Sequence, residues 1–218
     1  MKNPVTRKQL SVIYQRLLRS FGPQDWWPAK TPFEVIVGAI LTQNTAWANV
    51  EKAIANLKRA HCLNPAKIKN LSFRRLAELI RPSGYYNIKA KRLKSFINFF
   101  FKEYRGQVCR MSKAPTGILR RQLLEVKGIG PETADSILLY ACEKPVFVVD
   151  AYTKRMLSRH HLLDGKLDYA TVQRLFMQSL KPQEKLFNEF HALLVRLGKD
   201  YCKKIPRCNV CPLKSCLP

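Results

Sequence analysis

The chain has 218 residues, of which 46% are hydrophobic and 25% are charged, a composition typical of a folded globular protein and not of a disordered one. A protein of this length buries about 70% of the surface that its unfolded chain exposes, so it needs no disulfides to hold a core. Its 39 Lys and Arg residues against 15 Asp and Glu give a formal net charge of +24. That excess is larger than a small acidic substrate requires, which makes nucleic acid the first candidate partner.

The sequence predicts helices from one end of the chain to the other. Apolar residues recur at helical spacing from Leu10 to Phe21, and Gly22 ends that segment. Thr31 begins a capping box with Pro32 at the first helical position, so the next helix should run to about Gln43. Further helices are expected near residues 50–57, after a cap at Ser72, and near 89–104, 118–126, 132–142, 151–160, 168–179 and 183–200. The one strand-like run, 146–149, is too short to found a sheet, so the predicted fold class is all-α.

The sequence shows no segment typical of secretion or of a membrane span. Residues 1–22 lack the continuous apolar core of a signal peptide, and the most apolar run, 35–41, is too short to cross a bilayer. We therefore expect an intracellular, nucleoid-associated monomer without a membrane partner. An anionic membrane surface is the weaker alternative partner for its charge.

Residues 124–134, LEVKGIGPETA, place two glycines around one apolar residue between two predicted helices. Glycine permits a positive φ and a close backbone approach, and the second helix begins with free N–H groups at Pro131. Such a helix start can bind phosphate, although an ordinary tight turn is the alternative. The stretch resembles the helix-hairpin-helix motif of DNA repair proteins. The candidate DNA-binding residues here are Lys127, Gly128, Ile129 and Gly130.

Asp150 follows the buried-looking run 146–149 and precedes a predicted helix, where an N-cap is one explanation for it. A hairpin followed about twenty residues later by an aspartate resembles the helix-hairpin-helix glycosylase superfamily. The family closest in layout is endonuclease III, and the resemblance covers nearly the whole chain: segments 41–45, 84–90, 124–134, 149–150 and the terminal cysteines. It implies that Asp150 stabilises the sugar cation formed as an N-glycosidic bond breaks, and orients or deprotonates the attacking water.

Bifunctional members of the endonuclease III family carry a lysine two residues after the second hairpin glycine, and this lysine forms a Schiff base with the sugar. The matching residue here is Glu132, which cannot form one, so the resemblance implies a monofunctional glycosylase that uses water. Glutamate at this position, followed by Thr133, Ala134 and Asp135, is similar to the MagIII branch of 3-methyladenine DNA glycosylases. Glu132 would then contact the flipped base, while a structural role beside a helix N-terminus stays open.

Three tryptophans, Trp26, Trp27 and Trp47, also fit the MagIII branch, as do segments 41–45 and 81–87. Alkylation makes adenine cationic, which weakens its glycosidic bond and favours an aromatic cage by cation–π attraction. The tryptophans are therefore a candidate pocket for a flipped base, with core packing as the alternative. The same resemblance implies that Gln43 enters the vacated base position and that Tyr85 wedges the opposite strand, unless both are ordinary surface residues.

Four of the seven cysteines lie close together near the C-terminal end, and gaps of five, two and four residues separate Cys202, Cys208, Cys211 and Cys216. This crowding predicts a metal site. A structural zinc usually takes two cysteine pairs far apart in sequence, whereas one pair in a tight loop favours an iron–sulfur cluster. The loop resembles the [4Fe–4S] loop of endonuclease III, but its first and last gaps are each one residue shorter, so zinc stays an alternative. Four thiolate ligands predict a structural metal.

The basic helix near residue 90 and one histidine have simpler interpretations. The helix expected at 89–104 carries Lys89, Lys91, Arg92 and Lys94 on a basic face, which predicts a phosphate track or a merely solvated surface. His191 lies on the apolar helix before the cysteines and is interpreted as a packing residue.

By the resemblance, residues 23–133 form a six-helix domain that ends in the hairpin, and 1–22 with 134–218 form a second helical domain, with the active cleft between them. The predicted function is a base-excision-repair DNA glycosylase that acts on an alkylated purine such as 3-methyladenine in duplex DNA. Three alternatives stay open. They are an endonuclease III-type oxidised-pyrimidine glycosylase with lyase activity, a mismatch glycosylase acting on uracil, thymine or adenine, and a non-catalytic damage-binding protein.

Overall fold

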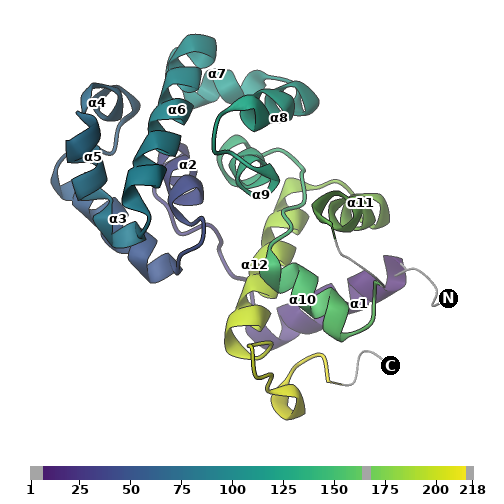
Figure 1. Cartoon of the computed structure of the whole chain (residues 1–218). Coiled ribbons are helices and arrows are strands. Elements are labelled where there is room, and N and C mark those ends of the chain that lie inside the picture. The colour runs from purple at the N-terminus through teal and green to yellow at the C-terminus, as the bar shows by residue number, and fades with distance from the viewer. Residues whose placement is uncertain (1–6, 164–167, 215–218) are drawn as a thin grey trace. The chain divides into compact units, whose positions relative to one another are not determined.

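The computed structural model describes residues 7–163 and 168–214, and the chain divides into two compact units (Figure 1). Unit 1 comprises Met1–Pro28 with Pro145–Pro218, and unit 2 comprises Ala29–Lys144. All regular elements in the described ranges are helical, which confirms the all-α class. In the same ranges, no helix combines the length and apolarity that crossing a bilayer requires.

Unit 2 is built around α2 (Pro32–Leu41), in which every residue from Phe33 onward is buried. A helix that is apolar on all sides is stable only inside a core, and α2 packs against α3, α6, α9 and η2. The remaining elements of this unit are α3 (Trp47–Arg59), α4 (Pro65–Asn70), α5 (Phe73–Leu79), η1 (Arg81–Ser83), α6 (Tyr86–Tyr104), α7 (Val108–Lys113), α8 (Thr116–Glu125), α9 (Pro131–Ser136) and the π-helical turn η2 (Ile137–Ala141).

The helix starts of unit 2 follow local capping chemistry. The Thr31 hydroxyl accepts a hydrogen bond from the backbone N–H of Glu34 at 3.2 Å, and Ser72 caps α5 in the same way, as predicted. The sequence did not predict α4 and α7, because helices of six residues contain too few turns to show an apolar period. The helix expected to begin at Lys89 begins earlier, at Tyr86.

Unit 1 contains α1 (Arg7–Phe21), α10 (Ala151–Arg159), α11 (Tyr169–Ser179), α12 (Glu184–Asp200) and η3 (Cys208–Val210). The helix α12 packs against both α1 and α10. A Cβ atom at Gly198 of α12 would lie 2.2 Å from the ring of Tyr152, so glycine is what lets α10 approach this closely. The core of this unit contains stacked and edge-on aromatic rings, which belong to Phe147, Phe176, Phe187 and Phe190.

The unit boundaries fall after Pro28 and after Lys144, whereas the family resemblance implies boundaries before residue 23 and after residue 133. The later second boundary has a packing cause. The turn η2 continues directly from α9 and packs against α2, so it belongs to unit 2.

Candidate functional site

The hairpin between α8 and α9 has the geometry expected of a close backbone approach. Gly128 has a φ of +93°, and a Cβ there would lie 2.3 Å from Cγ of Arg92, so no other residue fits without displacement. Ile129 is buried and anchors the turn, while Lys127 and Gly130 are exposed. The hairpin therefore presents its backbone to solvent on one side and is fixed by an apolar side chain on the other.

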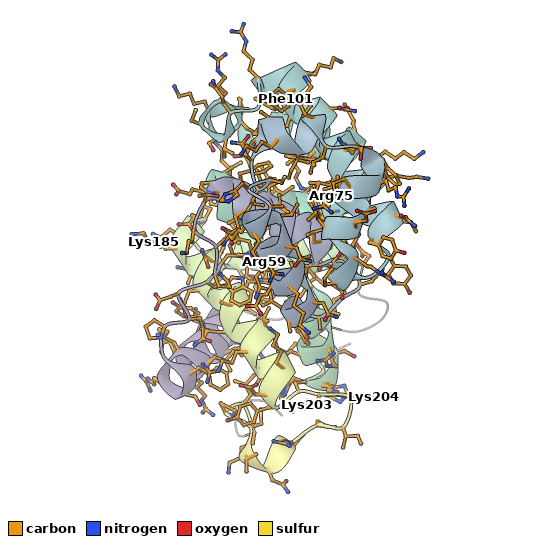
Figure 2. All side chains as sticks on the ribbon, turned by 90° about the vertical axis from the view of Figure 1, so that its left-hand side faces the viewer. Arg59, Arg75, Phe101, Lys185, Lys203 and Lys204 are labelled. Carbon is orange, nitrogen blue, oxygen red and sulfur yellow. The ribbon has the colours of Figure 1, made fainter. Side chains whose placement is uncertain are left out.

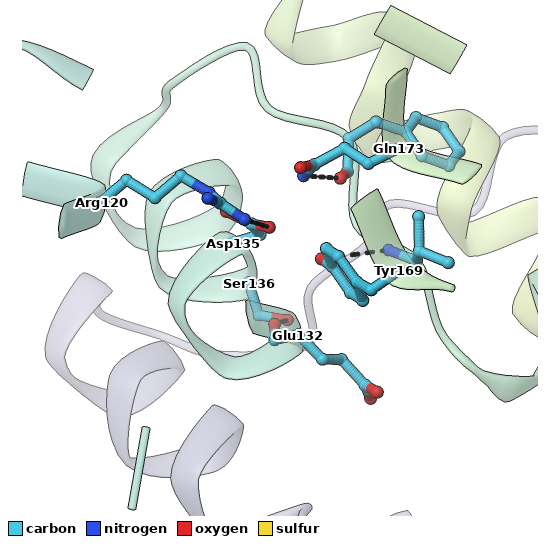
Figure 3. A network of polar contacts seen from close by, with 8 residues as sticks. Arg120, Glu132, Asp135, Ser136, Tyr169 and Gln173 are labelled. Atoms are coloured by element: carbon cyan, nitrogen blue, oxygen red, sulfur yellow. Dashed lines mark hydrogen bonds and ion pairs between the residues drawn. The ribbon is translucent and has the colours of Figure 1, made fainter. Parts of the chain in front are cut away.

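A buried ion pair ties the two hairpin helices together (Figure 3). The Arg120 guanidinium on α8 donates to both carboxylate oxygens of Asp135 on α9, at 2.7 and 3.0 Å, and Asp135 is fully buried. The Ser136 hydroxyl donates to the backbone oxygen of Glu132 at 2.7 Å. The bidentate contact between Arg120 and Asp135 fixes the orientation of α9 relative to α8.

Gln43, just after α2, is held against this hairpin. Its side-chain Nε2 donates to the backbone oxygen of Gly128 at 3.1 Å and to Oγ1 of Thr133 at 2.9 Å. Its Oε1 accepts from the Arg92 guanidinium. The structure thus brings together two predicted DNA-binding sites, Gln43 and the hairpin. Arg92 and Thr133 link these two sites. The sequence pointed to Thr133 only as part of the stretch similar to MagIII, and gave no sign of its contact with Gln43.

The basic face expected on α6 is partly wrong. Lys89 is only 1% exposed, and its Nζ donates to the backbone oxygens of Leu41 at 2.8 Å and Ser83 at 2.6 Å. Burial lowers the pKa of Lys89 to about 8, helped by the charge of Arg92. Lys94 donates to backbone oxygens at the end of α4. Both lysines therefore satisfy helix ends rather than face a phosphate.

Tyr85 is exposed, as a residue that inserts into DNA must be. It precedes α6 with a φ of +45° and is 69% exposed, directly after Gly84 at φ +67°. A ring this exposed is accessible to a partner. Its role as a wedge stays a prediction.

Glu132 lies in the first turn of α9 in unit 2 and is exposed (Figure 3). A carboxylate there is favoured by the partial positive charge at a helix start. Asp150 belongs to unit 1, so the two predicted catalytic carboxylates come from different units.

Asp150 is the N-cap of α10, which was one of the two explanations that the sequence offered for this residue. Its Oδ1 accepts from the backbone N–H of Thr153 at 2.7 Å and from the Thr153 hydroxyl at 2.8 Å. Its Oδ2 lies 3.7 Å from Nε2 of His191 on α12. The residue is 9% exposed, so the carboxylate is held almost entirely inside the protein.

The segment before Asp150 is buried but is not a strand, and side chains of α11 bind its backbone (Figure 3). Nε2 of Gln173 donates to the Phe147 backbone oxygen at 2.7 Å, and the Tyr169 hydroxyl accepts from the Val149 N–H at 3.4 Å. A buried backbone group without such a partner would cost about 1–3 kcal/mol. These contacts fix the approach to Asp150, and the sequence offered no signal for Gln173 or Tyr169.

His191 is buried, and this burial lowers its pKa, with the Asp150 carboxylate opposing the shift. The imidazole is therefore neutral near pH 7. Its placement beside a predicted catalytic residue was missed when His191 was interpreted as packing.

The tryptophans divide between the units. Trp26 and Trp27 are half-buried in unit 1, with ring centroids 5.5 Å apart at 58°, and Nζ of Lys199 lies 5.6 Å from the Trp26 ring. Trp47 begins α3 in unit 2, where its Nε1 donates to Glu51 at 2.9 Å. The aromatic cage stays a prediction.

The cysteine loop follows α12 and is fastened to α10. Arg155 donates to the backbone oxygen of Cys202 at 2.6 Å, and Arg159 donates to the Cys202 sulfur at 3.3 Å and to the backbone oxygens that follow. Cys202 is buried, Cys208 is exposed, Cys211 is partly buried, and Cys216 lies outside the described residues. Within those residues, no three candidate ligands gather around one point. Through Arg159, α10 thus places a hydrogen-bond donor on the sulfur of one predicted metal ligand, Cys202.

Positive side chains cover the surfaces of both units. Figure 2 shows Arg59 and Arg75 on unit 2 and Lys185, Lys203 and Lys204 on unit 1, all of them exposed. Exposed charge of this kind suits a phosphate backbone and makes binding depend on salt.

Comparison with known proteins places this geometry in a family context. Residues 37–182 match the model of the HhH-GPD superfamily base excision DNA repair protein. A protein of Methanocaldococcus jannaschii, named for an inferred DNA repair glycosylase activity, is 50% identical over 205 residues, 93% of each chain. The crystal structure of H. pylori 3-methyladenine DNA glycosylase (MagIII) bound to 1,N6-ethenoadenine aligns at a TM-score of 0.74 with 34% identity, covering 88% of this chain and 95% of that one. An endonuclease III–DNA complex shares the fold at a TM-score of 0.82, with 21% identity over 98% of this chain and 95% of its own.

Proposed function

Since this chain belongs to the HhH-GPD superfamily of base excision DNA repair proteins and is a DNA glycosylase that binds damaged DNA, we propose that it excises an alkylated purine such as 3-methyladenine. The observation that carries this proposal is Glu132 at the position of the lyase lysine, together with 34% identity to MagIII. Family membership sets aside the alternative of a non-catalytic damage-binding protein. A substrate of this kind implies action on chromosomal DNA inside the cell.

Asp150 is the proposed catalytic carboxylate. As the N-glycosidic bond breaks, the electron pair of that bond leaves with the base and positive charge develops on the sugar. A buried carboxylate stabilises that charge more strongly than an exposed one, and Asp150 is 9% exposed. Water then attacks the sugar and gives its proton to this carboxylate. No amine is needed, so the reaction ends at an abasic site with the strand intact.

The proposed base pocket combines Glu132 with the three tryptophans. An adenine methylated at N3 in DNA is cationic, and both an exposed carboxylate and an indole face attract a cation. Trp26 already has an ammonium group, that of Lys199, near its ring. This supports a pocket whose selectivity comes from the positive charge of the base rather than from its hydrogen-bonding edge.

The hairpin, Gln43 and Tyr85 are the proposed DNA contacts. Lys127, Gly128, Ile129 and Gly130 would form the phosphate-binding turn, in which the Ile129 N–H already donates to the Val126 backbone oxygen at 3.0 Å and so holds the turn's shape. Gln43 would fill the vacated base position, and its hydrogen bond to the Gly128 backbone oxygen supports a role next to the proposed phosphate-binding turn. Tyr85, at 69% exposure, would wedge the opposite strand.

We also propose a structural [4Fe–4S] cluster held by Cys202, Cys208, Cys211 and Cys216. The donor set and the Arg159 contact to the Cys202 sulfur support it. Purified protein should contain about four iron and four sulfide per chain, and Cys202→Ser should lose them while the exposed control Cys109→Ser does not. One zinc per chain without sulfide would replace the cluster by the zinc alternative.

The function is tested with end-labelled duplexes that carry either one 3-methyladenine-type lesion, one oxidised pyrimidine or one mismatched base. We expect the alkylated duplex alone to be cut, and only after alkali has cleaved the abasic site. Cutting of the oxidised duplex without alkali would identify an oxidised-pyrimidine glycosylase with lyase activity instead. Selective cutting of a mismatched duplex would identify a mismatch glycosylase.

A further inference from the structure

The two oxygens of the Asp150 carboxylate have different surroundings. Oδ1 accepts two hydrogen bonds from Thr153, from its N–H and from its hydroxyl, and so holds the start of α10. Oδ2 makes neither of these contacts and faces His191 of α12, 3.7 Å from Nε2. An oxygen with two short donors is a poorer proton acceptor than one without them. The capping geometry therefore separates a structural oxygen from a chemically available one.

His191 is in a position to act on that available oxygen. It is buried, and because burial lowers its pKa the ring is neutral near pH 7. A neutral imidazole with its proton on Nε2 is a hydrogen-bond donor toward a carboxylate. The separation of 3.7 Å is slightly long for a hydrogen bond, but catalytic contacts of this kind often tighten when substrate binds.

The two helices that carry this pair are fastened to each other. Arg155 of α10 donates to the backbone oxygens of Gly198 at 3.2 Å and of Cys202 at 2.6 Å. Tyr152 packs on Gly198, where no Cβ fits. Because both elements are fixed, the relative position of Asp150 and His191 is set by the backbone and not by two mobile side chains.

We propose that Oδ2 of Asp150 is the oxygen that takes part in base excision, and that His191 is a positioning residue that holds Oδ2 through Nε2. This inference rests on the proposed function of Asp150. One lone pair of Oδ2 accepts the imidazole N–H, and the other faces the sugar and receives the proton of the attacking water. The imidazole itself neither gains nor loses a proton in the reaction.

Four substitutions separate a positioning role of His191 from a packing role. In His191→Gln the side-chain Nε2 can reach the place of the imidazole Nε2, whereas the side chain of His191→Asn is too short to bring its donor there and His191→Leu has no donor. The fourth substitution, Asp150→Asn, tests the carboxylate itself. The measurements are the single-turnover excision rate, the DNA dissociation constant and the unfolding temperature. Loss of a hydrogen bond to a charged group should slow excision by about 10- to 100-fold in the Asn and Leu variants. His191→Gln should stay within about 5-fold of the wild type, with DNA affinity unchanged in all three His191 variants.

The inference is overturned if the Gln and Asn variants lose activity equally, or if neither loses any. The comparison of these two polar variants does not depend on whether His191→Leu folds. Failure of the proposed function gives a different pattern, in which Asp150→Asn excises bases at the wild-type rate. An inactive Asp150→Asn beside fully active His191 variants rejects only the positioning role.

Discussion

The hairpin of unit 2 and the Asp150 region of unit 1 hold their polar groups in opposite ways. Around the hairpin, Gly130 and Lys127 are exposed, and the buried parts serve to present a backbone to solvent. Around Asp150, residues 146–149 are buried and their backbone groups bind side chains of α11. The first region keeps its hydrogen-bonding groups accessible, and the second encloses them.

This difference matches two different tasks. A phosphate clamp must meet its ligand from solvent, and its strength lies in the number of accessible donors and positive charges. A carboxylate that stabilises a cation acts best where water is excluded and its orientation is fixed beforehand. The comparison therefore supports the proposal that the hairpin binds DNA and that Asp150 does the chemistry, and substitutions in the two regions should separate the two properties.

The largest effect is expected from Asp150→Asn, which keeps an N-cap but removes the charge. Excision should slow by about 100- to 10,000-fold, because the developing sugar cation and the water lose their partner. DNA affinity should change little, since the hairpin is untouched. A matched control is Asp168→Asn, because Asp168 caps α11 in the same way, accepting from Thr171 N–H at 3.0 Å. If the excision rate fell equally in the two variants, the role of Asp150 would be that of a helix cap alone.

Gly128→Ala tests the other side of the comparison. A side chain at φ +93° is strained and would displace Arg92, so the hairpin should lose its approach to phosphate. We expect DNA affinity to fall by about 10- to 100-fold, with the excision rate of the saturated complex nearly unchanged. Gly117→Ala is the control, because a Cβ there meets nothing within 4 Å. A slower saturated rate with unchanged affinity would contradict the division of tasks.

Gly198→Ala should act through the framework that holds Asp150. The added Cβ would lie 2.2 Å from the Tyr152 ring, so α10 must shift against α12. Overpacking of this kind costs about 1–3 kcal/mol of unfolding free energy, measurable by urea titration. Excision should also slow, while DNA affinity stays near that of the wild type. A stability loss with an unaltered rate would mean that α12 does not position the carboxylate.

Folding stability should also depend on pH through the buried Lys89, whose pKa falls from 10.5 to about 8 in the folded chain. Between these values the unfolded chain binds more protons than the folded one, so folding stability should rise as pH increases from about 8 toward 10.5. The comparison is with Lys89→Met, which lacks the group and should also leave the Leu41 and Ser83 oxygens without their donor. Parallel stability curves for both proteins over this pH range would contradict the assignment.

Local features of the sequence predicted the fold well, because they act over a few residues. The caps at Thr31 and Ser72 and the stop at Gly22 need only neighbours along the chain, and the structure has them. Six-residue helices such as α4 were missed because their signal is a single cap, here Asn64, without a period.

Contacts between residues distant in sequence could not be predicted. Lys89 was expected on a solvated face, but the backbone oxygens that bury it come from Leu41 and Ser83, outside its own helix. His191 and Asp150 are likewise far apart along the chain and meet only because α10 packs on α12. A sequence pattern names residue types, whereas these pairs depend on how helices pack.

Borohydride trapping during excision tests most directly whether the chemistry belongs to a buried carboxylate and water. Borohydride reduces a Schiff base to a stable bond, so an enzyme that attacks the sugar with an amine becomes joined to its DNA. With an alkylated duplex, this protein should release the base and yield no covalent complex, while a lyase of the endonuclease III type run beside it yields one. A covalent complex formed by the wild-type chain would mean that one of its own amines attacks the sugar, and the account built on Glu132 and Asp150 would be wrong.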